Sequence, residues 1–91
     1  MSLGKNKERV AWDFICVNGI DLLILTDEMP EGLAIGYKFE TMVFRALKNG
    51  EPDFNKPFDE YTNRYQTKED ALIGHGELVS KLYDLAIREG E

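Results

Sequence analysis

The sequence has one cysteine, one histidine and no long apolar run, and each of these shortages excludes a class of protein. The single cysteine, Cys16, cannot close an internal disulfide, so a disulfide-stapled secreted domain is excluded and a reducing cytoplasm fits best. The longest apolar run covers residues 22–25, whereas a membrane span needs about 20 residues, and the N-terminus lacks a secretory signal pattern. One histidine, one cysteine and scattered acids fit neither a zinc site nor an EF-hand, and we predict no metal and no cofactor.

Positive charge is also scarce. Eleven Lys and Arg stand against 17 Asp and Glu, which gives a net charge of −6. Phosphate backbones and anionic lipids reward clustered positive charge, so we expect neither nucleic acid nor a membrane as partner. An acidic nucleic-acid mimic is the least favoured function, because the acids are spread among basic residues instead of forming one acidic face.

What the chain does have is enough apolar sequence for one small core. Its 91 residues are 43% hydrophobic, which predicts a single domain over residues 1–91. Residues 1–8 are interpreted as an N-terminal tail, and Met1-Ser2-Leu3 at its start resembles a vector-derived remainder.

The strongest local signal is a β-hairpin over residues 9–26. Asn18-Gly19 supplies the two positive-φ positions of a type I′ turn, so that paired residue numbers sum to 37 and Trp12 faces Leu25. Because side chains alternate, both faces of the hairpin are apolar near the turn. One face carries Val10, Trp12, Phe14, Cys16, Leu23 and Leu25, and the other carries Ile15, Val17, Ile20, Leu22 and Ile24.

The rest of the chain predicts further strands and one helix. A third strand is expected over residues 33–47 with a bend at Gly36, then a surface loop over residues 48–57 and an edge strand over residues 60–66. The fold class is therefore α+β, an antiparallel meander of three to four strands (β-β-β-β-α) with one C-terminal amphipathic helix packed on one face.

The helix is predicted from Thr67 to about Arg88. Thr67 and Asp70 form an imperfect capping box, and an apolar stripe follows at three- and four-residue spacing. Gly74 and Gly76 each disfavour the helix by roughly 1 kcal/mol, which indicates close packing against another backbone or a local weak point. The stripe comprises Leu72, His75, Val79, Leu82 and Ala86, flanked by Ala71, Leu78 and Leu85.

Two segments resemble a known family. They read Glu40-Thr41-Met42-Val43-Phe44 and, from Arg64 onward, R-Y-Q-T-K-E-D-A followed by G-H and E-L-V. This pattern resembles a family of small uncharacterised proteins of Gram-positive bacteria and their phages, in which Leu78 is usually methionine. The resemblance covers about half the chain, implies no activity, and supports the strand–loop–strand–helix order of the second half.

The candidate polar cluster is Glu40, Arg64 and His75. If the third and fourth strands are neighbours, Glu40 and Arg64 can pair across them, with His75 on the helix above. We interpret the cluster as a structural ion pair that fixes the helix on the sheet; the alternative is a small enzyme with its site there. A Cys16–His75 nucleophile–base pair is formally possible, but Cys16 is better explained as a small buried hydrophobe. We therefore predict no catalytic residue.

The apolar faces lead to the main functional hypothesis. One helix covers one face of the sheet, which leaves the other apolar set without an intramolecular cover. The candidate interface is Ile15, Val17, Ile20, Leu22 and Ile24, or else the opposite set. The predicted function is a non-enzymatic protein–protein interaction module that forms a homodimer, with a phage or prophage accessory role.

Overall fold

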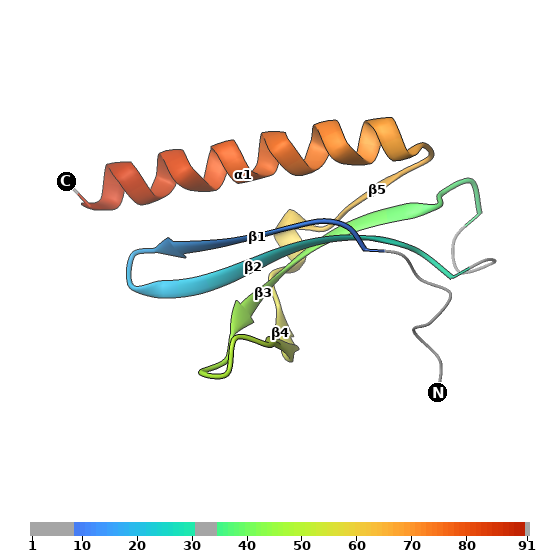
Figure 1. The fold of residues 1–91 in the computed structure, drawn as a ribbon. Helices are drawn as coiled ribbons and strands as arrows, with labels where there is room; N and C mark the ends of the chain where they lie inside the picture. The colour runs from blue at the N-terminus through green and yellow to red at the C-terminus, as the bar shows by residue number, and fades with distance from the viewer. Residues whose placement is uncertain (1–8, 31–34, 91) are drawn as a thin grey trace.

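The protein is an antiparallel sheet with one long helix lying along one face (Figure 1). The computed structural model describes residues 9–30 and 35–90, and the predicted tail over residues 1–8 lies outside this part. The meander consists of β1 (Arg9–Val17), β2 (Ile20–Glu28), β3 (Phe39–Ala46) and β4 (Pro52–Pro57); β5 (Asn63–Tyr65) also pairs with β3, and α1 (Lys68–Gly90) follows. The predicted α+β class and the β-β-β-β-α order are confirmed.

The β1–β2 hairpin has the register that the sequence predicts. Trp12 pairs with Leu25, and Val17 pairs with Ile20 across the turn. Asn18 and Gly19 have φ angles of 53° and 80°, as a two-residue type I′ turn requires. The pairing slips only near Arg9, where a bulge interrupts it.

The middle of the chain differs from the sequence prediction. Residues 52–57, expected to be loop, form β4, because a turn closed by the Gly50 amide on the Leu47 carbonyl (2.8 Å) folds the chain back beside β3. The two prolines that bound this strand led to the loop prediction, but proline is tolerated in a strand at a sheet edge. β3 begins at Phe39 and not at Leu33, which is outside the described residues, and the positive φ of Gly36 (83°) lies in the turn before the strand. The expected strand over residues 60–66 is a 3₁₀ turn at Asp59–Tyr61 followed by the short β5.

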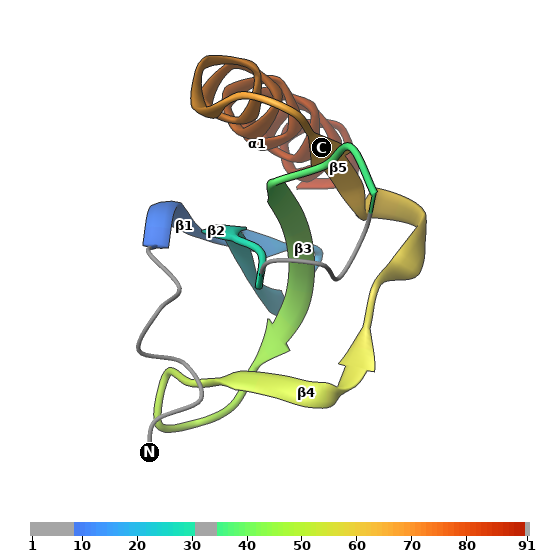
Figure 2. The ribbon, with the colours of Figure 1, turned by 90° about the vertical axis from the view of Figure 1, so that its right-hand side faces the viewer.

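The apolar side chains form two clusters, one on each face of the sheet. Figure 2 shows α1 above the sheet and β4 below it. On the β4 side, the Phe54 ring meets the edge of Phe44 at 5.1 Å between centroids. The cluster under α1 comprises Ile15, Leu22, Ile24, Val43 and Leu82, and the cluster on the β4 side comprises Leu23, Leu25 and Phe44.

The helix begins where the capping pattern predicts. The Asp70 amide donates to Thr67 Oγ1 at 3.0 Å, which satisfies one of the free amides of the first turn. Ala71, His75 and Leu82 are buried against the sheet, whereas Leu72 is about half exposed. His75 and Leu82 of the predicted stripe are therefore confirmed as buried, whereas Leu72 lies on the flank of the helix and Ala71, predicted to flank the stripe, is buried in its place.

The two helix glycines have different surroundings. A Cβ on Gly74 would lie within 2.6 Å of three Tyr65 side-chain atoms, the phenol oxygen and two ring carbons, so Gly74 makes room for the Tyr65 side chain. A Cβ on Gly76 would meet nothing within 4 Å. The sequence suggested close packing against another backbone; Gly74 instead packs against the Tyr65 side chain, and Gly76 has no such neighbour within the chain.

These surroundings predict opposite outcomes for two matched substitutions. Gly76→Ala should raise the free energy of unfolding by about 1 kcal/mol, because it gains helix propensity without a clash. Gly74→Ala should lower it by about 1–2 kcal/mol, because displacement of Tyr65 outweighs the same gain. Urea denaturation at a concentration where the chain is monomeric measures both. Equal stabilisation by the two substitutions would show that Tyr65 does not pack on Gly74.

Candidate functional site

The predicted polar cluster is split between the two faces of the sheet. Glu40 and Arg64 are direct cross-strand partners in β3 and β5, and Arg64 Nε donates to Glu40 Oε2 at 3.0 Å. Both Thr41 and Val43 are buried on the helix side of β3, so alternation places Glu40 on the opposite side. The predicted ion pair is present, but His75 is not above it.

His75 instead joins three other polar side chains beneath the helix. Its Nε2 lies 2.7 Å from Asp13 Oδ2, and its Nδ1 lies 2.7 Å from Thr26 Oγ1. Thr26 Oγ1 is in turn hydrogen-bonded to Thr41 Oγ1. The four side chains of this hydrogen-bond network come from α1 and from three strands, β1, β2 and β3. His75 thus fixes the helix on the sheet, with partners that differ from those proposed.

The hydrogen bonds of this network have one consistent direction for a neutral imidazole. Thr41 donates to Thr26, Thr26 donates to Nδ1 of His75, and the Nε2 hydrogen is donated to the Asp13 carboxylate. Every donor then has an acceptor, which is the condition under which buried polar groups stabilise a core.

An Asp–His–Thr sequence of contacts also occurs in nucleophilic catalysis, but this one is closed to a substrate. Thr26 and Thr41 have no exposed surface, and His75 is 5% exposed. A nucleophile has to reach its substrate, so Thr26 cannot serve as one in this fold. The network is structural.

Cys16 and His75 do not form a pair. Cys16 alternates with Ile15, which is buried under α1, so its thiol lies on the face opposite the helix. Cys16 is also exposed, where the sequence suggested a buried thiol.

The candidate interface residues lie under the helix. Ile15, Leu22 and Ile24 are core, and Val17 and Ile20 pack at its margin against the same cluster. The five residues therefore do not form an uncovered face. Of the opposite set, Leu23 and Leu25 are also buried, whereas Trp12, Phe14 and Cys16 are exposed. The physical reason is that both sheet faces are apolar, so the apolar stripe of α1 could pack on either. The path of the chain from β5 into α1 places Leu82 against the face that carries Ile15, Leu22 and Ile24.

The sheet face opposite α1, called the uncovered face below because α1 does not cover it, has a buried cluster and an exposed aromatic rim. Leu23, Leu25 and Phe44 form the buried cluster. On β1, Trp12 is 62% exposed and Phe14 is 49% exposed, although each pairs with a buried leucine of β2. Exposed apolar side chains that continue a buried cluster are typical of an interaction surface.

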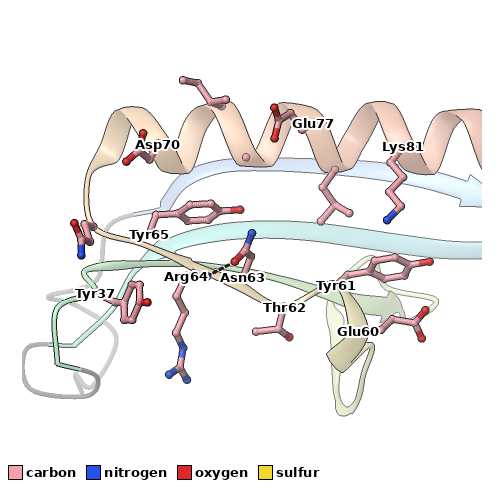
Figure 3. A pocket seen from close by; sticks show the side chains of 14 residues that line it. Tyr37, Glu60, Tyr61, Thr62, Asn63, Arg64, Tyr65, Asp70, Glu77 and Lys81 are labelled. Atoms are coloured by element: carbon pink, nitrogen blue, oxygen red, sulfur yellow. Dashed lines mark hydrogen bonds between the residues drawn. The ribbon is translucent and has the colours of Figure 1, made fainter.

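A groove of about 590 Å³ runs between α1 and β5 on the other side of the molecule (Figure 3). The Tyr65 ring packs against Gly74 of the helix, and Lys81 extends from the helix so that its ammonium lies 6.0 Å from the centre of the Tyr61 ring. Burial and the adjacent Glu60 carboxylate raise the pKa of the Tyr61 phenol above its ordinary value. The Thr62 hydroxyl, which borders the groove, is buried without a hydrogen-bond partner. The groove mixes acidic and basic side chains and does not include His75.

Sequence reasoning missed Asp13 and Thr26. The available signal was the alternation of side chains along the two strands. Asp13 lies two residues from Ile15 and Thr26 lies two residues from Ile24, so each polar side chain falls on the otherwise apolar face. Across the described ranges, 9–30 and 35–90, no three or more His, Cys, Asp or Glu side chains are grouped to hold a metal ion. The helix in this part of the chain is not both long and apolar enough to cross a membrane.

The fold therefore defines the protein as an α+β meander, and its sheet carries apolar side chains on both faces. Comparisons with protein-family models, with curated proteins and with solved structures found no significant match to this chain.

Proposed function

We propose that this protein is a non-enzymatic interaction module that associates with itself as a homodimer. The observation that carries the proposal is the aromatic rim of β1, where Trp12 and Phe14 remain exposed beside the buried cluster of Leu23, Leu25 and Phe44. An exposed tryptophan next to a preformed apolar cluster is the composition of an interface hot spot. A two-fold dimer is the commonest way in which a chain covers such a surface.

The surroundings of the rim also favour a protein partner. The chain is 31% charged with a net charge of −6, yet the sheet face of β1 presents only apolar side chains and the Cys16 thiol between Trp12 and the turn. A second copy that meets Trp12 and Phe14 brings no like charges together on β1, although Asp21 of β2 lies beside Cys16 on the same face. The exposed and unpaired thiol is consistent with the reducing cytoplasm, and the resemblance noted above suggests a phage or prophage accessory role.

Light scattering over a concentration series tests the proposal. We expect a dimer at micromolar concentration, and we expect Trp12→Lys to give a folded monomer, because Trp12 is exposed and its replacement leaves the core intact. The control is Ile35→Lys, since Ile35 is 98% exposed in the turn before β3 and should not affect the dimer. A wild-type chain that stays monomeric throughout the series would overturn the proposal.

A further inference from the structure

The outer edge of β1 is the second feature of this surface. In the described part of the chain, β1 pairs with β2 alone and stands at the end of the sheet. Val17 and Ile20 flank the type I′ turn and therefore exchange hydrogen bonds with each other. Alternation from that pair directs the backbone N–H and C=O groups of odd-numbered β1 residues toward β2. Those of Trp12, Phe14 and Cys16 point outward.

This edge lacks the features that usually prevent strand pairing. Between the bulge near Arg9 and the turn, β1 contains no proline and no lysine. Its one charge, Asp13, projects to the helix side and is held by His75. A long edge strand whose outward-paired residues carry no charge and include exposed aromatic side chains readily accepts another strand.

The helix flank above this edge is also apolar. Gly74 faces β5 through Tyr65. Because successive helix residues are about 100° apart, Gly76 projects to the opposite flank, over β1, together with Leu72, Val79 and Tyr83. Leu72 and Tyr83 are about half exposed, and Gly76 has nothing near it in the single chain. A partner helix approaching here would explain a glycine that otherwise only weakens the helix.

We infer that two copies of the chain join edge to edge, with β1 antiparallel to β1 and α1 packed against α1 around one two-fold axis at Phe14. The inference rests on the proposed self-association and specifies its geometry. Placing Phe14 opposite Phe14 sets Trp12 opposite Cys16, so all three outward-facing residues find hydrogen-bonding partners. It also places Asp13 opposite Ile15, whereas an axis at Asp13 would set two carboxylates side by side.

The helix supports the same axis independently. α1 runs in the same direction as β1 (Figure 1), and His75 is level with Asp13 because the two are bonded. One strand residue advances about 3.4 Å and one helix residue about 1.5 Å, so one step along β1 corresponds to about two residues of α1. Phe14 therefore lies at the same height along the helix axis as about residue 77. That level is midway between Leu72 and Tyr83. The two-fold axis that pairs the strands therefore also sets Leu72 of one copy against Tyr83 of the other.

Matched lysine substitutions test this geometry in the full chain. Phe14→Lys and Tyr83→Lys lie on opposite faces of the sheet, and only an edge-to-edge dimer uses both; each should weaken association at least about tenfold in sedimentation equilibrium. The controls are Phe54→Lys on β4 and Ile73→Lys on the β5 flank of the helix. Phe54 is 69% exposed and Ile73 is 55% exposed, close to Tyr83 at 54%, and both controls should dimerise normally.

Amide hydrogen exchange separates this inference from the proposed function. In the dimer, the amides of Trp12, Phe14 and Cys16 should exchange about 15-fold more slowly at a total chain concentration ~100 times the dissociation constant than in the dilute monomer, because about 7% of the chains are still monomeric there. A monomeric wild-type chain would overturn both proposals. A dimer in which these three amides exchange as fast as in the monomer, or one that tolerates Tyr83→Lys, would overturn the edge-to-edge geometry alone.

Discussion

Replacing Ile24 with aspartate should unfold the protein instead of producing a monomer. Ile24 has no exposed surface and lies in the cluster under α1 with Val43 and Leu82. A carboxylate there would be buried without a partner, which costs several kcal/mol, and small domains have only about 5–15 kcal/mol of total stability. Far-ultraviolet circular dichroism and urea denaturation should show loss of the cooperative transition.

Two further variants make this result interpretable. Ile24→Val should remain folded and lose about 1 kcal/mol, since it removes a single methyl group from the same position. Trp12→Asp places the same charge on the pairing neighbour of Leu25, on the uncovered face, and should leave the unfolding transition nearly unchanged. If Ile24→Asp gave a folded monomer and the wild type were a dimer, the face under α1 would be the interface after all.

Replacing His75 with alanine should lower the free energy of unfolding by about 2–4 kcal/mol. The substitution removes a buried ring and both of its hydrogen bonds, and it leaves the Thr26 hydroxyl with only Thr41. Asp13 loses less, because its side chain is 49% exposed and can be hydrated. The expected order of destabilisation is therefore His75→Ala, then Thr26→Val, then Asp13→Asn, which keeps an oxygen acceptor for Nε2 and should cost less than about 1 kcal/mol.

A double-mutant cycle checks that these residues act as one network. His75→Ala should cost at least about 1 kcal/mol less in the Thr26→Val background than in the wild type, because the Nδ1 bond has already been lost. Lys81→Ala, at an exposed position on the same helix, controls for general effects on α1. Additive single and double substitutions would contradict the network.

Local signals predicted the regular elements well where they have a strong physical basis. Asn18-Gly19 can adopt the positive φ angles of a type I′ turn, so the turn alone sets the β1–β2 register. Thr67 caps the helix through a bond to an amide three residues on. β4 was missed because Pro52 and Pro57 obscure it, and its pairing depends on the chain returning to β3.

The candidate site was predicted less completely, because contacts across the sheet depend on which face each element covers. The Glu40–Arg64 pair follows from strands being neighbours, and it was found. The His75 partners depend on the side of the sheet where α1 lies, and Asp13 and Thr26 are distant from His75 in the sequence. For the same reason the candidate interface of Ile15, Leu22 and Ile24 is core.

The sequence by itself determined the hairpin, the helix and the presence of apolar side chains on both faces of the sheet, because alternation and helical spacing are local properties. Only the tertiary structure decided which face α1 covers, because both faces are comparably apolar and the path of the chain through β5 makes the choice. That decision leaves Trp12 and Phe14 exposed at the free edge of β1, with Leu72, Gly76 and Tyr83 above them.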